Sequence, residues 1–142
     1  MKTIQQLLDQ KGSQVWSIGP DASVRDALAL MVEKNIGALL VIADTGPIGL
    51  VSERDFARRL DLIDGAASDT PVHEIMTSQV VCVSPDQPLE EAMALMTEKR
   101  VRHLPVLDDG QVLGLVSIGD LVHAVIAEQR FIIEQLEHYI NA

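Results

Sequence analysis

The sequence predicts an α+β fold built from two similar small subdomains, and two observations support this prediction. Shifted by 65 residues, the 142-residue chain matches itself at sixteen positions between Gly19 and Phe56, without a gap. In each copy, short apolar runs suited to strands alternate with apolar residues at helical spacing. Neither copy is long enough to bury a large core alone, so we expect the two to pack sheet to sheet.

Each copy has the pattern strand, helix, strand, strand, helix. Proline and glycine end the opening run of the first copy, and Asp44-Thr45-Gly46-Pro47 separates its two later strands. The first copy is predicted to hold a strand at 15–18, a helix at 24–36, strands at 38–43 and 48–51, and a helix from Ser52. The second copy is predicted to hold a strand at 80–83, a helix at 89–101, strands at 104–107 and 112–116, and a helix from Ser117.

These elements divide the chain into four segments. Subdomain 1 covers 1–61, a linker rich in Gly, Ala, Ser and Asp covers 62–69, and subdomain 2 covers 70–126. A C-terminal helical extension follows over 127–142, because apolar residues continue there at helical spacing. The extension either folds back on its own domain or forms a symmetric dimer contact, and we favour the dimer contact.

Composition excludes several classes of partner. The chain has 21 acidic residues against 11 Lys and Arg, a formal net charge of −10, and only 3% aromatic residues. An acidic surface repels phosphate backbones, and so few aromatic side chains cannot stack bases, so nucleic acid is not the expected partner. The longest uncharged apolar stretch, 36–43, is too short to span a membrane, and the first ten residues do not resemble a signal peptide. We therefore expect a cytoplasmic protein.

The sequence gives little support for a catalytic site or a metal site. The single cysteine, Cys82, excludes an intramolecular disulfide and lies in an apolar run typical of an inert core thiol. No Walker A, G-x-G-x-x-G, G-x-S-x-G or H-E-x-x-H motif is present. Glu134 and His138 are one helical turn apart, but such pairs on exposed helices are mostly solvated, so we expect neither a metal nor an enzyme.

The most distinctive motif is Ser-x-x-Asp at the start of the last helix of each copy, Ser52–Asp55 and Ser117–Asp120. The motif can be a capping box, in which serine and aspartate satisfy the first backbone N–H groups. It can equally bind a ligand, because the helix start attracts a phosphate and the carboxylate accepts hydrogen bonds from ribose hydroxyls. The motif at Ser23–Asp26 becomes Pro88–Glu91 in the second copy, so a purely structural cap is free to change.

Basic residues are distributed unequally between the copies. Arg100, Arg102 and His103 precede a strand of the second copy, and the corresponding residues of the first copy are uncharged and small. They form either a solvated edge or a phosphate site, because arginine binds phosphate through two hydrogen bonds. Lys11 is a further candidate, although a plain turn is the simpler interpretation. Arg54, within the first Ser-x-x-Asp motif, is replaced by Gly119 in the second.

The repeated G-L-V-S-x-x-D and the strand Arg102-His103-Leu104-Pro105-Val106 resemble a pair of CBS domains (cystathionine β-synthase domains) over the chain up to Ile126. The resemblance implies a non-catalytic sensor that binds AMP, ADP, ATP, NAD(H) or S-adenosylmethionine in clefts between the subdomains. It assigns ribose binding to the two serine–aspartate pairs, and it implies a homodimer that signals to a downstream protein. The alternative is a structural dimerisation platform with empty clefts.

The expected ligand sites differ in charge. Arg54, Arg102 and His103 are expected to favour ligands with more phosphate at the Asp55 site, whereas the Asp120 site, with small uncharged neighbours, is expected to favour fewer charges. The opening strands and the residues that follow the first helix match adenine-lining positions of the family. The complete set of candidate ligand-binding residues is Lys11, Ser17, Ile18, Gly37, Ala38, Leu39, Ser52, Arg54, Asp55, Cys82, Val83, Arg102, His103, Leu104, Pro105, Ser117, Gly119 and Asp120.

Overall fold

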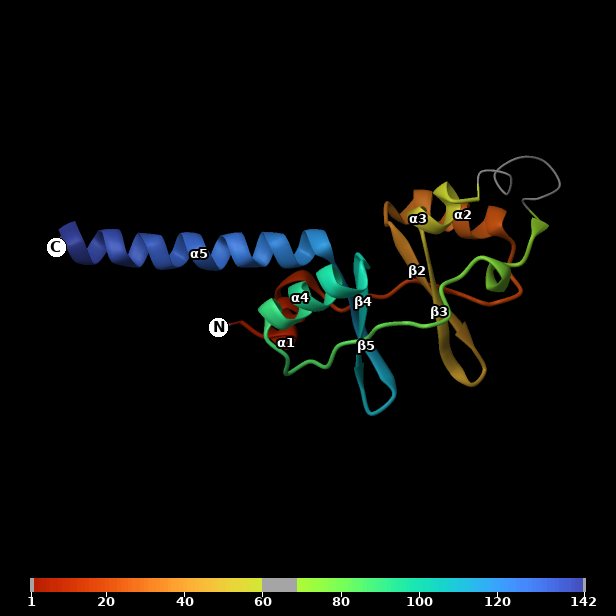
Figure 1. Ribbon diagram of the computed structural model, residues 1–142, viewed down its shortest axis with the longest axis horizontal. Helices are drawn as coiled ribbons and strands as arrows, with labels where there is room; N and C mark the ends of the chain where they lie inside the picture. Colours follow the sequence, from red (N-terminus) through yellow and green to blue (C-terminus); the bar gives the residue numbers. More distant parts are fainter. Residues whose placement is uncertain (1, 60–68, 142) are drawn as a thin grey trace. The chain divides into compact units, whose positions relative to one another are not determined.

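A computed structural model describes residues 2–59 and 69–141, and the chain divides into two units. The first-copy unit is Val15–Val80, and the second-copy unit combines Met1–Gln14 with Val81–Ala142. Both units mix helices with a small sheet, which confirms the predicted α+β class (Figure 1). The expected linker at 62–69 lies, apart from Asp69, outside the described residues.

The first-copy unit contains a three-stranded sheet in the order β1-β2-β3. β1 runs parallel to β2, and β2 pairs antiparallel with β3. The Ser23 hydroxyl caps α2 by accepting the Asp26 N–H, and Asn35 ends this helix in the left-handed conformation. Its elements are β1 (Ser17–Ile18), α2 (Val24–Lys34), β2 (Ala38–Ala43), β3 (Gly46–Ser52), α3 (Glu53–Ala57) and the 3-10 helix η3 (Val72–Glu74).

The second-copy unit contains an antiparallel pair, β4 and β5. The strand predicted at 80–83 is reduced to a parallel bridge between Val83 and Val106. In the first copy, the Leu40 N–H donates to the Trp16 carbonyl oxygen at 3.2 Å, whereas the residue corresponding to Leu40 is Pro105, which has no N–H. The elements of this unit are α1 (Ile4–Lys11), α4 (Leu89–Lys99), β4 (His103–Asp108), β5 (Gln111–Ser117) and α5 (Ile118–Asn141).

The segment that precedes each copy packs with the other copy. Thr3 forms an antiparallel bridge with Pro88, and Pro71 forms the corresponding bridge with Ser23. α1 therefore belongs to the second-copy unit, and η3 belongs to the first-copy unit. The apolar pattern of the sequence does not predict α1, although Thr3 and Gln6 form a capping box at its start.

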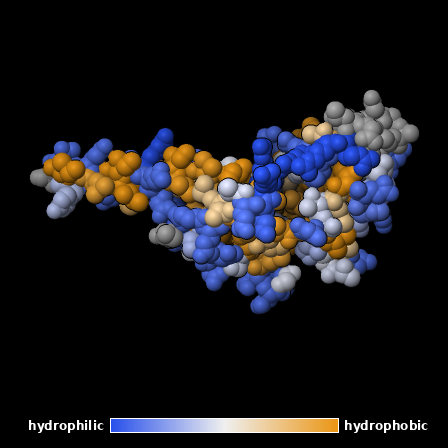
Figure 2. Space-filling model, in the orientation of Figure 1, coloured by the Kyte–Doolittle hydropathy of each residue, from blue (hydrophilic) through white to orange (hydrophobic). Residues whose placement is uncertain are grey.

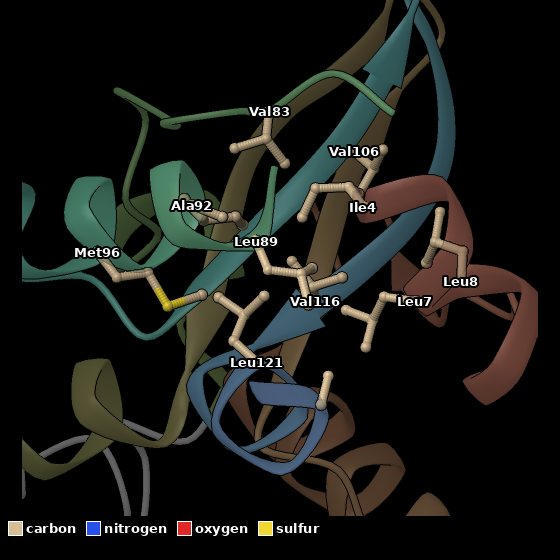
Figure 3. Packing of buried hydrophobic residues seen from close by; sticks show 12 residues of the cluster. Ile4, Leu7, Leu8, Val83, Leu89, Ala92, Met96, Val106, Val116 and Leu121 are labelled. Atoms are coloured by element: carbon tan, nitrogen blue, oxygen red, sulfur yellow. The ribbon is translucent and has the colours of Figure 1, made fainter. Parts of the chain in front are cut away.

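Each unit has its own apolar core. In the second-copy unit, side chains of α1 and α4 meet those of β4, β5 and α5, as Figure 3 shows. Leu8 of α1 lies over Gly114 of β5, where an added Cβ would be 2.6 Å from a leucine methyl. Met76 lies over Gly49 of β3 in the same way, with its sulfur 2.5 Å from such a Cβ. These glycines allow a close approach that a larger residue would prevent.

α5 is one continuous helix of 24 residues, so the predicted extension at 127–142 continues the last helix of the second copy without a break. Leu121 and Ala124 are its buried residues, and every residue from Gln129 to Asn141 is exposed. Figure 1 shows the distal part of α5 running away from the rest of its unit. Among the described residues, no helix is long and apolar enough to cross a membrane.

Candidate ligand sites

The Asp55 carboxylate lies at the start of α3, where β3 ends. Its Oδ2 accepts the backbone N–H of Ser52 at 2.8 Å and the Ser52 hydroxyl at 3.2 Å. The Thr77 hydroxyl donates to Oδ1 at 3.4 Å. The aspartate at the third helical position therefore satisfies the N–H of the capping serine, as the capping interpretation predicted.

The Asp120 carboxylate has the corresponding place at the start of α5. Its Oδ2 accepts the Ser117 N–H at 2.9 Å, while the Ser117 hydroxyl accepts the Asp120 N–H at 3.1 Å. The Lys11 ammonium lies 2.8 Å from the same Oδ2. Burial alone would raise the pKa of Asp120, but hydrogen bonds from Lys11 and Ser117 and the charge of Lys11 lower it below the ordinary value.

Lys11 and Thr77 make equivalent contacts in the two units: each donates to the motif aspartate and to a carbonyl oxygen of the preceding strand. The Lys11 ammonium donates to the carbonyl oxygen of Leu115 at 2.7 Å, and the Thr77 N–H donates to the carbonyl oxygen of Leu50 at 2.8 Å. Leu115 and Leu50 correspond in the repeat. Sequence reasoning missed Thr77, because its segment corresponds to the N-terminal segment at a shift of 68 rather than 65 residues. The available signal was the similarity of apolar residues at that shift, Ile4, Leu7 and Leu8 with Val72, Ile75 and Met76.

The residues that begin the middle strands flank these motifs within each unit. In the first-copy unit, the Gly37 carbonyl accepts the Glu53 N–H at 3.1 Å, and Ala38 is the register partner of Ser52. In the second-copy unit, the Arg102 carbonyl accepts the Ile118 N–H at 2.9 Å, and His103 is the register partner of Ser117. The basic pair at 102–103 thus lies beside the Ser117–Asp120 motif of its own copy, along with Lys11. The structure therefore places charged neighbours at the Asp120 carboxylate, where the sequence favoured small uncharged ones. The assignment of Arg102 and His103 to the Asp55 site stays a prediction.

The candidate adenine-lining residues fall into three groups by exposure. Ser17 is exposed, whereas Ile18, Gly37 and Cys82 are partly buried. Burial raises the pKa of the Cys82 thiol, which makes it a weak nucleophile. The remaining ones are buried and offer little surface to a ligand: Ala38, Leu39, Val83, Leu104 and Pro105. Arg54 and Gly119, which follow the motif serines, are exposed.

Metal ligation has no site in the described part of the chain. Across 2–59 and 69–141, no group of three or more His, Cys, Asp or Glu side chains is arranged to hold an ion. The chemistry that the motifs offer is therefore hydrogen-bond acceptance by two fixed carboxylates and donation by nearby cations.

The fold and the repeated motif define a tandem-repeat protein with one carboxylate site in each copy. Comparison with protein families identifies these copies: the CBS domain matches residues 12–62 and residues 72–127. The chain therefore belongs to the CBS domain family, as a pair of CBS domains.

Known proteins agree with this assignment. The chain is 37% identical over 135 residues to the mitochondrial CBS domain-containing protein CBSX3 of Arabidopsis thaliana, covering 92% of this chain but only 65% of that protein. A solved CBS-domain protein of Burkholderia ambifaria MC40-6, provisionally assigned to signal transduction, is 49% identical, with a TM-score of 0.84 over 90% of this chain and 96% of that one. The CBS domain pair of protein MJ0100, solved with 5′-methylthioadenosine and S-adenosyl-L-methionine, shares the fold at 21% identity, with a TM-score of 0.78 over 90% of this chain and 98% of that one.

Proposed function

We propose that this protein is a non-catalytic sensor of adenine nucleotides, with AMP, ADP, ATP and NAD(H) as candidate ligands. The observation that carries the proposal is the pair of anchored carboxylates, Asp55 and Asp120. A carboxylate has about four lone-pair sites. At Asp120 the hydrogen bonds from Ser117 and Lys11 are both on Oδ2, which leaves Oδ1 for two ribose hydroxyls. At Asp55 the bonds from Ser52 and Thr77 leave one site, so a second ribose hydroxyl would replace the Thr77 hydroxyl, whose bond is the longest at 3.4 Å. Capping and ribose binding therefore use the same side chain at once.

Family membership supports the adenosine part of the ligand. The two molecules bound to MJ0100 share an adenosine moiety and carry no phosphate. Among the residues proposed to line the adenine, Ile18 and Cys82 keep some accessible surface, whereas Leu39 and Leu104 are fully buried.

Nearby basic side chains support a phosphate on the ligand. Lys11, Arg102 and His103 lie beside the Asp120 motif in their own unit, and Arg54 is two residues after Ser52. Ammonium and guanidinium groups form strong charge-assisted hydrogen bonds with phosphate oxygens. Ligand binding would then favour one geometry of a homodimer, and a partner protein would recognise that geometry.

Calorimetry with AMP, adenosine and the 2′- and 3′-deoxyadenosines tests the ribose assignment. Asp55→Ala and Asp120→Ala each remove a charged acceptor, so we expect adenosine affinity at the altered copy to fall roughly ten- to a hundredfold. Asp26→Ala is the matched control, because Asp26 belongs to the same motif at the start of α2 but has no proposed ligand. If the wild-type protein binds adenosine and the two deoxyadenosines with equal affinity, the ribose assignment is wrong and only the capping role remains.

A second candidate function is a dimerisation platform without a ligand. The apolar residues exposed along the distal part of α5 favour it, because such surfaces mark protein contacts. Thermal unfolding with a panel of nucleotides separates the two functions. A sensor is stabilised by the nucleotide it binds, while a platform unfolds at the same temperature with or without it.

A further inference from the structure

The distal half of α5 carries an apolar stripe that its own unit does not cover. Its large apolar side chains are at least 44% exposed from Ile126 onward, and Figure 2 shows apolar side chains along this helix. About 15 residues beyond the core, at 1.5 Å per residue, extend the helix by ~23 Å. An isolated helix of this length is only marginally stable in water, so a packing partner would add to the stability of this segment.

The spacing of the stripe indicates another helix as the partner. Ile126, Gln129, Ile133, Leu136 and Ile140 follow one another at alternating steps of three and four residues. This alternation is the seam of a left-handed helix pair, in which side chains from one helix fill gaps on the other. The stripe is therefore shaped for a helix rather than for a flat surface.

The residues that flank the seam indicate that the partner helix is α5 of a second copy, running antiparallel. One flank is apolar, with Ile132 and Tyr139, and the other holds opposite charges seven residues apart, Arg130 and Glu137. In an antiparallel pair, like flanks face each other, so Arg130 meets Glu137 of the second copy twice by symmetry. A parallel pair would instead place each apolar flank against a charged one.

The same charges select the register. When the two helices cross with their symmetry axis between Glu134 and Gln135, Ile133 packs against Leu136 of the second copy and Arg130 faces Glu137. When the axis lies at Phe131, a full contact of the seams is also possible, but each Arg130 then faces the other Arg130. Like charges at such positions are destabilising, so the first register is favoured.

The area involved is adequate for a specific contact. Five large apolar side chains of each copy lie in the overlap, and they are 50–83% exposed in the single chain: Ile132, Ile133, Leu136, Tyr139 and Ile140. At ~100 Å² for each side chain, the pair would bury about 1,000 Å² in total, near the lower limit of specific interfaces. We propose that two copies of this chain pair through antiparallel α5 helices centred between Glu134 and Gln135. The proposal does not depend on nucleotide binding.

Sedimentation velocity of the full chain across a concentration series tests the surface. We expect a dimer whose dissociation constant rises at least tenfold with Leu136→Glu, which places a charge in the seam. Phe131→Glu is the matched control, because Phe131 is 61% exposed on the same helix but lies off the seam. Arg130→Glu or Glu137→Arg alone should weaken the dimer, and the double variant should restore it.

Disulfide trapping tests direction and register, even if other contacts also join the copies. In a Cys82→Ala background, a mixture of Gln129→Cys and Ile140→Cys chains should form mixed disulfides, while each variant alone should not. Ile126→Cys alone should not form a disulfide, because its two copies would lie ~25 Å apart at 1.5 Å per residue. A parallel pair would link each single variant to itself and overturn the proposal. A full chain that stays monomeric and forms no disulfide in any combination would also overturn it.

Discussion

The ammonium of Lys11 lies 2.8 Å from Oδ2 of Asp120, although 109 residues separate the two in the sequence. In the first-copy unit the corresponding aspartate, Asp55, instead accepts a hydrogen bond from the neutral hydroxyl of Thr77. Two repeated carboxylates with the same helix-capping role thus have partners of different charge. The two proposed ligand sites therefore differ in charge.

The Lys11–Asp120 pair should make stability depend on pH. Because Lys11 helps to lower the pKa of Asp120 below the ordinary 3.8, the pair stabilises the fold above that value. This contribution is lost as pH falls through the lowered pKa. We expect Lys11→Met to destabilise the chain at neutral pH and the difference from wild type to shrink in acid, as measured by urea unfolding at both pH values.

Lys2→Met is the control for that experiment. Lys2 donates to the neutral side chain of Gln10, so its removal should cost little and the cost should not vary in the acid range. A Lys11→Met destabilisation that is equally large in acid and at neutral pH would assign the whole effect to the hydrogen bond with Leu115 and to packing.

Lys11 should also select for phosphate at the Asp120 site. We propose that, when a nucleotide occupies the site, the ammonium that now binds Asp120 also donates to a phosphate oxygen. We expect Lys11→Met to weaken AMP about tenfold and adenosine much less, with an effect that shrinks in high salt. Thr77→Val, the corresponding change in the other copy, should not alter the ratio of AMP to adenosine affinity. Equal losses for both ligands would remove Lys11 from the phosphate site.

The register of the repeat predicted most of the fold. It located β2 at its observed limits, and it placed the start of the last helix of each copy at Ser52 and Ser117. The run 80–83 has the apolar content of a strand, yet Pro105 removes the N–H that a second ladder bond would need. α1 was missed because its mostly polar sequence gives a weak pattern, and its capping box was the available signal.

The candidate sites were predicted only in part. The serine–aspartate motifs were visible because they recur, and the structure shows both as helix starts. The Lys11 contact was not predictable, because it depends on α1 packing with the other copy. Local sequence carries no information about such a long-range exchange of segments.

The ends of α2 and α4 offer a matched pair of backbone positions. Asn35 and Arg100 correspond in the repeat, and both adopt the left-handed conformation, with φ of 53° and 56°. Asparagine tolerates this conformation better than arginine does. We expect Arg100→Gly to raise the free energy of unfolding by about 0.5–1 kcal/mol and Asn35→Gly by less, as measured by urea denaturation. A larger gain at Asn35 would contradict this explanation.

The close approach of α1 to β5 gives a prediction of coupling between Leu8 and Gly114. Gly114→Ala places a methyl 2.6 Å from a Leu8 methyl, so the leucine must move, at a cost of about 1–3 kcal/mol in unfolding free energy. Leu8→Ala alone leaves a cavity and should cost about 2–5 kcal/mol. In the double variant the new methyl occupies part of that cavity, so we expect less destabilisation than the sum of the two.

Substitutions at Gly49 and Gly19 are expected to cost more and less unfolding free energy, respectively, than Gly114→Ala. Gly49→Ala should cost more than Gly114→Ala, because its methyl would also lie 3.1 Å from the Thr77 carbonyl oxygen, a backbone atom that cannot rotate away. Gly19 has no atom within 4 Å of an added Cβ and no left-handed φ, so Gly19→Ala should be nearly neutral. Urea unfolding of the four single variants and the Leu8–Gly114 double variant measures the coupling. Strict additivity in the double variant would show that the two side chains do not share this space.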